Sequence, residues 1–261
     1  GAKPVFVDID RRTWTIDTEQ IEKKINKKTK AIMPVHIYGH PCEMTKILNI
    51  AKKHNLLVIE DAAEAHGAKY HDKKIGSIGD LTIFSFFANK NITSGEGGMI
   101  TTNNKKIFDL LKKLRNQAFS SKRHFWHSYI GFNYRMTNLQ AAIGCAQVKK
   151  MEKLVNMRIN NAKYFNKYLK NISGIIIPPE TENVKNVYWM YTIEVDKKNF
   201  GMDAITLRYK LADKGIETRS FFIPLHLQPI YYNRTFKKKF PISESIFKNA
   251  FYIPSSSHLS K

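Results

Sequence analysis

One lysine of this 261-residue chain, Lys90, lies in a glycine-rich loop that directly follows a short apolar stretch. Residues 80–87 are β-branched and aromatic and too few for a helix, so they predict a buried strand. The loop over 89–98 contains three glycines, which allow positive φ and a close approach of the backbone to a ligand. Alone, Lys90 is most simply a solvated surface cation. Whether Lys90 has a chemical role depends on which other residues lie beside it in the folded chain.

A neutral lysine amine can attack a carbonyl to form a Schiff base, and the cofactor that lysine most often serves is pyridoxal phosphate. That cofactor also needs a carboxylate beside its pyridine nitrogen and a group that binds its phosphate. Asp61 ends an expected strand, and Ser85 lies five residues before Lys90 on the next strand along the chain. Asp61 could equally be a local cap, and a serine at a strand end is common. Together, in this order, the three residues favour a pyridoxal phosphate site.

The elements that must position these residues alternate between strand and helix. Strands are expected over 5–8, 31–38 and 56–59, a capping box opens a helix at Asp17, and an amphipathic helix is expected over 43–55. This alternation predicts a mostly parallel sheet with helices on both faces, whose ligands bind beyond the carboxyl ends of the strands.

The remainder of the chain predicts a second, smaller α/β unit. A return strand over 98–102 and a helix over 104–115 come first, followed by a long helical stretch over 139–169. After it, strands are expected over 175–177, 188–195 and 217–222, with a helix over 204–214. We place the boundary within the long helix, which gives a large domain over 1–155 and a small one over 156–261.

Composition narrows the possible functions. The net charge is +21, but the basic residues are scattered, and the only longer run is Lys237 to Lys239. A nucleic-acid-binding or regulatory protein should instead cluster its basic residues among exposed aromatics. No membrane-spanning run or signal peptide is present, so we expect a cytoplasmic protein. Two cysteines form neither a disulfide framework nor a zinc site, and no metal is expected.

Three motifs resemble the DegT/DnrJ/EryC1/StrS sugar aminotransferases. They are E-D-A-A-E-A-H-G-A at 60–68, G-D-L-T-I-F-S-F-F-A-N-K-N-I-T-S-G-E-G-G at 79–98 and G-F-N-Y-R-M-T-N at 131–138. The resemblance implies a fold type I, aspartate aminotransferase-like enzyme that transfers an amino group from glutamate to a nucleotide-linked 4-keto-6-deoxy sugar. Complete members of the family have a segment before the position of Gly1 and a closing helix after that of Lys261, so the chain resembles a fragment.

The resemblance also implies roles for individual residues. Lys90 would be the catalytic residue that binds the cofactor covalently and moves protons. Asp61 would pair with the pyridine nitrogen and Ser85 would bind the phosphate. Glu64, where the family often has glutamine, would contact the side of the phenolic oxygen. Asn133 would reach the phosphate in a neighbouring subunit, so a homodimer is expected.

The expected substrate contacts, again by resemblance, are His124, Arg219 and His226. One branch of the family carries histidine in place of the lysine and performs dehydration, and Lys90 argues against that reaction. A third possibility is that Lys90, Asp61 and Ser85 are unrelated structural residues that lie apart in space. Their arrangement in the folded chain distinguishes these readings.

Overall fold

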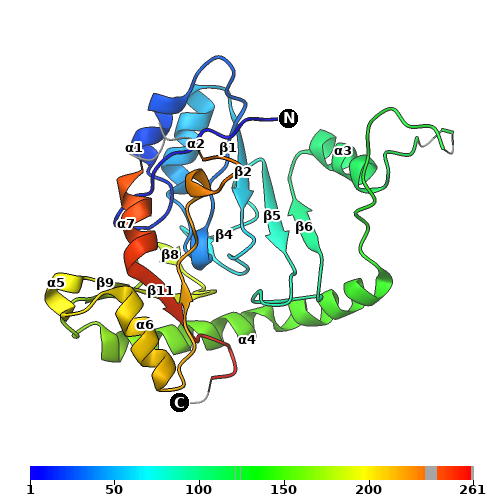
Figure 1. The fold of residues 1–261 in the computed structure, drawn as a ribbon. Helices are drawn as coiled ribbons and strands as arrows, with labels where there is room; N and C mark the ends of the chain where they lie inside the picture. Colours follow the sequence, from blue (N-terminus) through cyan, green and yellow to red (C-terminus); the bar gives the residue numbers. More distant parts are fainter. Residues whose placement is uncertain (121, 124, 233–239, 260–261) are drawn as a thin grey trace.

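The central feature of the computed structural model is a four-stranded sheet (Figure 1). The structure describes residues 1–120, 122–123, 125–232 and 240–259. The sheet has the order β1-β2-β5-β6, and its strands are β1 (Ala31–Ile32), β2 (Leu57–Asp61), β5 (Leu81–Ser85) and β6 (Gly98–Thr101). The strands β1, β2 and β5 are parallel, whereas β6 returns antiparallel to β5. The mostly parallel sheet is as predicted.

One face of this sheet is covered by α2 (Met44–Lys53), which contacts β1 and β2. Ile32 and Val58, paired in register, point into the resulting core. Residues on the other face alternate with them, and Met33, Val35 and Leu57 are exposed there. Among the described residues, the apolar core of this sheet therefore lies on the α2 side, whereas helices were predicted on both faces.

Several predicted elements are shorter than expected. No strand forms over 5–8, and the pairing that follows is a single bridge between Ile9 and Ile16. The strand β1 stops early because Pro34 cannot donate a ladder hydrogen bond, and the chain then turns through the 3₁₀ helix η2 (Ile37–Gly39). Asp17 caps α1 (Thr18–Ile21) as predicted, accepting from the N–H of Glu19, but a second 3₁₀ helix, η1 (Glu22–Lys24), follows after one turn.

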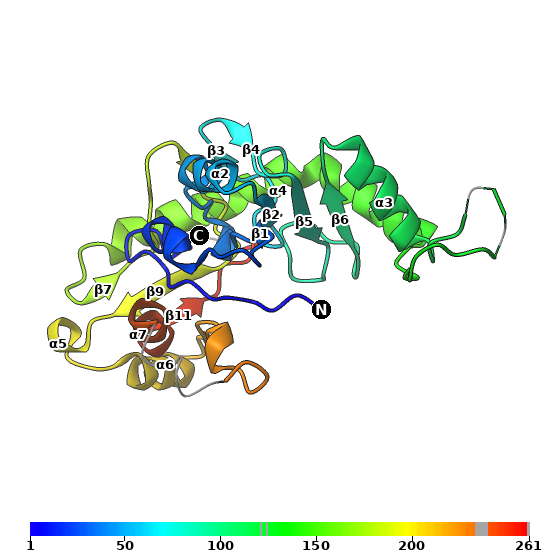
Figure 2. The same cartoon turned by 90° about the horizontal axis from the view of Figure 1, so that it is seen from above.

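The long helix α4 (Asn138–Leu169) joins the two halves of the molecule. Thr137 and Gln140 form a capping box at its start. Val155 packs in the core beneath the main sheet, and Ala162 packs in the core of the second unit. Figures 1 and 2 show α4 extending from that second unit to the base of a projecting segment. The predicted domain boundary near residue 155 remains a prediction.

The projecting segment, the described residues of 116–137 (all but 121 and 124), is called the arm below. It lies between α3 (Lys105–Arg115) and α4, and it extends away from the sheet (Figure 1). Two antiparallel bridges, Asn116 with Asn133 and Phe119 with His127, hold it folded back on itself. Many of its large apolar side chains are exposed: Phe125, Trp126, Tyr129, Ile130, Phe132 and Tyr134.

The second unit is built on an antiparallel sheet of order β10-β11-β9-β7. Its elements are β7 (Ile175–Ile176), β9 (Tyr191–Val195), α5 (Lys197–Phe200), α6 (Ala204–Asp213), β10 (Arg219–Ser220), η3 (Leu225–Leu227), α7 (Pro241–Asn249) and β11 (Ala250–Ile253). A third sheet joins β3 (Lys69–Tyr70), β4 (Lys73–Lys74) and β8 (Val184–Lys185). We did not predict β3, β4, α7 or β11 from the sequence. No helix within the described ranges is long and apolar enough to span a membrane.

Candidate active site

Asp61 and Ser85 lie at the carboxyl ends of neighbouring parallel strands. Asp61 is in register with Ile83, two residues before Ser85. Both backbone polar groups of Asp61 bond to the segment after β1, because its N–H donates to Pro34 and its carbonyl accepts from His36. The Asp61 carboxylate accepts from the N–H of Ala63 through Oδ1 at 3.0 Å. These two residues therefore share one edge of the sheet.

The residue before Asp61 anchors this edge from the core. Glu60 is fully buried and accepts at Oε1 from the N–H of Gly79 at 2.7 Å and from the hydroxyl of Thr82 at 2.8 Å. Its Oε2 lies 3.0 Å from Nε2 of His36, whose Nδ1 accepts from the N–H of Cys42. Burial alone raises the pKa of Glu60, but these hydrogen bonds outweigh it and hold the pKa below its usual value. The carboxyl end of β2 is therefore rigidly placed.

Lys90 lies in the ordered loop between β5 and β6. The N–H of Lys90 donates to Phe87, the N–H of Ser94 donates to Phe86, and the N–H of Phe86 donates to Gly97. Gly97 has φ of +130°, and a Cβ there would lie 3.1 Å from Met136 and Ser94. Glycine at this position therefore satisfies both backbone conformation and space. The predicted positive φ values occur at Gly95 and Gly97, whereas Gly98 belongs to β6.

The Lys90 amine points inward rather than into solvent. Its side chain is 11% exposed, and Nζ lies 3.6 Å from Oε1 of Glu64. The same atom lies over the indole of Trp189, 3.7 Å from the ring centroid. Burial lowers the pKa of Lys90, and the negative charges of Glu64 and Asp61 oppose that shift. A lysine whose pKa is lowered in this way is more readily the neutral amine that a nucleophile requires.

Glu64 faces Lys90 from the segment after β2. Its Oε2 accepts from the N–H of Tyr38 at 2.7 Å. Burial raises the pKa of Glu64 to about 7, although Lys90 and the Tyr38 N–H both act to lower it. Near neutral pH, the Glu64 carboxyl group therefore exchanges a proton readily beside a buried amine.

Sequence reasoning assigned no role to Trp189 and His66, which interact with Lys90, or to Tyr38, whose N–H binds Glu64. Trp189 and Tyr38 come from distant parts of the chain. His66 is buried against Phe84 and Phe86, and burial, together with the charge of Lys90, lowers its pKa to about 4, so it is neutral. Two signals were available in the sequence: the aromatic run over 187–191, which includes Trp189, and the histidine within the E-D-A-A-E-A-H-G-A motif.

The other predicted residues have different partners. The Nε2 of His226 is 3.0 Å from Glu244, and its ring lies 4.3 Å from that of Phe240. Arg219 is exposed and pairs with Glu217 at 3.2 Å. Asn133 is exposed on the arm. Within the described residues, no hydrogen bond or ion pair joins Arg219, His226 or Asn133 to the lysine.

Two predictions fall outside the described residues. They concern His124, as a substrate contact, and the basic run Lys237 to Lys239. The proposed roles of the predicted site residues all remain predictions, because the structure tests their positions and not their chemistry.

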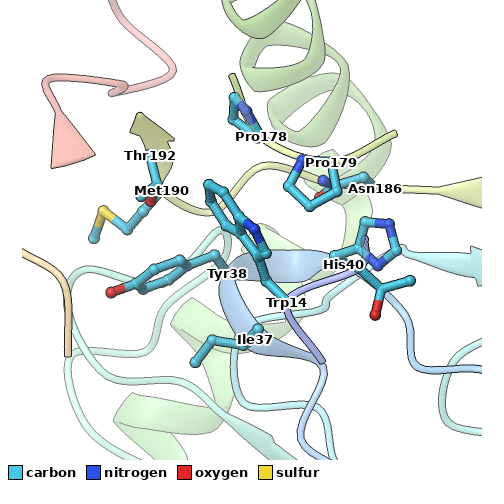
Figure 3. Close-up of a pocket in the computed structure, with 10 residues that line it drawn as sticks. Trp14, Ile37, Tyr38, His40, Pro178, Pro179, Asn186, Met190 and Thr192 are labelled. Atoms are coloured by element: carbon cyan, nitrogen blue, oxygen red, sulfur yellow. The ribbon is translucent and has the colours of Figure 1, made fainter. Parts of the chain in front are cut away.

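A small cavity of about 20 Å³ lies behind Tyr38, and none of the predicted site residues lines it. Figure 3 shows its lining side chains gathered around Trp14 and Tyr38. They are mostly apolar or aromatic: Thr13, Trp14, Ile37, Tyr38, His40, Pro178, Pro179, Asn186, Met190 and Thr192. The cavity is large enough for about one water molecule, so it is not where a substrate binds.

Two curated relatives with the same name are similar to this chain. The chain is 44% identical over 261 residues to GDP-perosamine synthase of Escherichia coli O157:H7, covering all of this chain and 70% of that protein. It is also 44% identical over 236 residues to GDP-perosamine synthase of Caulobacter vibrioides, covering 88% of this chain and 62% of that protein.

Solved structures agree on the fold. DesV of S. venezuelae superimposes with a TM-score of 0.92 at 30% identity, over all of this chain and 69% of that one. Helicobacter pylori PseC, an aminotransferase involved in pseudoaminic acid biosynthesis, gives a TM-score of 0.91 at 28% identity, over 99% of this chain and 70% of that one. The predicted aminotransferase fold is confirmed at this level.

The model of one family matches residues 1–261. The chain therefore belongs to the DegT/DnrJ/EryC1/StrS aminotransferase family, whose members are pyridoxal phosphate-dependent sugar aminotransferases.

Proposed function

We propose that this protein transfers an amino group from glutamate to the keto carbon of a nucleotide-linked 4-keto-6-deoxy sugar. The observation that carries the proposal is the buried amine of Lys90, held 3.6 Å from Glu64. It lies next to the edge of the sheet where Asp61 and Ser85 end neighbouring strands. An exposed lysine, or a lysine remote from these residues, would not support covalent catalysis.

The residues present fit pyridoxal phosphate. In the described part of the chain only the N–H of Ala63 bonds to the Asp61 carboxylate, and it does so at Oδ1, so Oδ2 is available to a ring nitrogen. The hydroxyl oxygen of Ser85 accepts from the N–H of Phe87 at 3.2 Å, which leaves the hydroxyl proton free to be donated to a phosphate.

When bound, the cofactor supplies an electron-accepting ring. The chain supplies the groups around that ring. Lys90 acts as the nucleophile and carries the proton at Nζ, and Asp61 keeps the ring nitrogen protonated. Ser85 holds the phosphate. Glu64, whose pKa burial raises to about 7, would lie on the side of the phenolic oxygen, where its carboxyl group could donate or accept a hydrogen bond.

The substrate we favour is GDP-4-keto-6-deoxy-mannose, with GDP-perosamine as the product, for surface polysaccharide such as O-antigen. Two motifs support this choice, W-H-S-Y-I-G-F-N-Y-R-M-T-N at 126–138 and V-Y-W-M-Y at 187–191, because they resemble GDP-perosamine synthase. Two relatives with that name share 44% identity with the chain. The alternative is another nucleotide sugar, since relatives of 38% identity include a transaminase named for a dTDP-linked 3-amino sugar.

We also propose a homodimer in which the arm contributes to the partner's site. The arm exposes apolar side chains of which Ile130, Phe125 and Tyr134 are each more than two thirds exposed. Exposed aromatics gathered on one segment mark an interaction surface. Asn133 lies among them and would reach the partner's phosphate-binding edge.

The experiment is to incubate the purified protein with glutamate and each member of a panel of GDP-, dTDP- and UDP-linked 4-keto-6-deoxy sugars. Mass spectrometry should detect an amino sugar formed from GDP-4-keto-6-deoxy-mannose, together with 2-oxoglutarate. Lys90→Ala is the matched inactive control. A product from a different nucleotide would correct the substrate, and no product from any sugar under cofactor-saturating conditions would refute the proposed reaction.

A further inference from the structure

A lysine that serves a Schiff-base cofactor is free during part of each catalytic cycle, and its amine must then stay within reach of the reacting atoms. Lysine is poorly suited to this, because its four-carbon stem has many rotamers and its ammonium is strongly hydrated. Glu64 alone holds the amine only weakly, since the 3.6 Å between Nζ and Oε1 exceeds the roughly 2.8 Å of a charge-assisted hydrogen bond. Another group must hold the amine.

Trp189 is in position to do so. Its indole lies with the centroid 3.7 Å from Nζ of Lys90, well within the range of a cation–π contact. The residue is 3% exposed, so water competes little for the ammonium on this side. Trp189 precedes β9, whereas Lys90 follows β5, so the contact joins the second unit to the main sheet.

Every polar group of Trp189 is bonded, and the partners come from separate segments. Its N–H donates to the carbonyl of Tyr38 at 2.8 Å. Its carbonyl accepts from Nη1 of Arg158 on α4 at 2.7 Å. Its indole Nε1–H donates at 2.8 Å to the carbonyl of Asn89, the residue before Lys90. The ring is therefore fixed relative to the lysine loop.

The same backbone segment fixes both sides of the amine. The N–H of Tyr38 binds Glu64 and its carbonyl binds Trp189. Tyr38 has φ of +52°, a conformation that costs free energy for a residue other than glycine and turns both backbone groups toward the site. The half-buried Arg158 also donates from Nη1 to the carbonyl of Ser255, so one guanidinium bonds the backbone of both Trp189 and Ser255.

We propose that Trp189 is a positioning residue that holds the free amine of Lys90 against its indole face, directed toward Glu64, whenever that amine is not covalently bound. The titratable groups that face the amine are Glu64, Asp61 and His66. The inference rests on the proposed function for its purpose, but the contact itself exists without cofactor.

The test uses cofactor-free protein labelled with ¹³Cε-lysine, in which the Lys90 methylene signal is identified by its loss in Lys90→Arg. Protons above an indole face are shifted upfield, so this signal should lie upfield of the other lysines. The shift should shrink in Trp189→Phe and disappear in Trp189→Leu. Trp14→Leu is the matched control, because Trp14 is also buried in the same aromatic cluster, whereas the indole that lies over Lys90 in the described part of the chain is that of Trp189.

Titration of the same signal gives a second readout, because the direction in which the pKa of Lys90 changes distinguishes two roles of the indole. If the indole stabilises the ammonium, the pKa of Lys90 should fall by about one unit in Trp189→Leu, with Trp189→Phe between that variant and the wild type. If Trp189 only excludes water, its loss should hydrate the amine and raise the pKa, which would overturn the proposal. An absent upfield shift in the wild type would overturn it too, even if Trp189→Leu does not fold.

Neither readout depends on catalysis. A protein that shows the expected shifts but aminates no sugar would refute the proposed function and leave the positioning role of Trp189 in place. A protein that aminates its substrate but shows neither shift would refute the positioning role of Trp189 and leave the proposed function in place.

Discussion

The pKa of Glu64 leads to a prediction about stability that needs neither cofactor nor substrate. Burial raises this pKa from an ordinary value of 4.5 to about 7. The folded protein therefore holds a proton that the unfolded chain releases between these two values. A group of this kind stabilises the fold fully below its unfolded pKa, and that contribution is lost as the pH rises through its folded pKa.

The magnitude follows from the shift. About 2.5 pKa units correspond to about 3 kcal/mol of unfolding free energy. Glu64→Gln removes the titration while keeping the shape of the side chain. The stability of the wild type relative to Glu64→Gln should thus be greatest near pH 4.5, decline by about 3 kcal/mol as the pH rises to 8, and then level off.

The assay is urea unfolding of both proteins, without cofactor, at half-unit steps from pH 4.5 to 8.5. Glu96→Gln, which makes the same substitution at an exposed position of the lysine loop, is the parallel control. In a Lys90→Met background the decline should continue to higher pH, since Lys90 lowers the pKa of Glu64. A wild-type minus Glu64→Gln difference that is flat across this range would refute the reasoning.

Two further predictions concern catalysis. Asp61→Ala should fold but lose about a hundredfold to a thousandfold in kcat, because a single electrostatic group at the reacting centre is removed; near-normal turnover in a steady-state assay would mean that another group holds the ring nitrogen. Mixing inactive Lys90→Ala with inactive Asn133→Ala under conditions of subunit exchange should restore activity, because each heterodimer then contains one intact site. Failure to regain activity despite exchange shown by native mass spectrometry would count against the shared site.

The sequence was sufficient to predict the sheet edge that carries the site. The strands that end at Asp61 and Ser85 are short runs rich in apolar and β-branched residues, and the glycines after Ser85 favour a loop. Because parallel strands end on the same edge, placing both side chains there required no knowledge of tertiary contacts.

The rest of the site depends on contacts between residues that are distant in sequence. Nothing local in the sequence shows that Trp189 lies over Lys90, since an aromatic run before a strand is ordinarily core. The turn that places Tyr38 beside Glu64 was also not predicted. Residues 31–38 are mostly apolar and fit a strand, but Pro34 and the positive φ of Tyr38 end the strand early. Two-residue strands such as β3 and β4 form through tertiary packing, so their local sequence shows little strand preference.

The central claim is that Lys90 binds pyridoxal phosphate covalently, and one measurement tests it directly. The protein is incubated with pyridoxal phosphate, treated with borohydride, digested and analysed by tandem mass spectrometry, with Lys46 and the other lysines as internal references. The account predicts one reduced phosphopyridoxyl group, located on the peptide that contains Lys90 and absent in Lys90→Ala. Modification of Lys90→Ala to the same extent at another single lysine would contradict it.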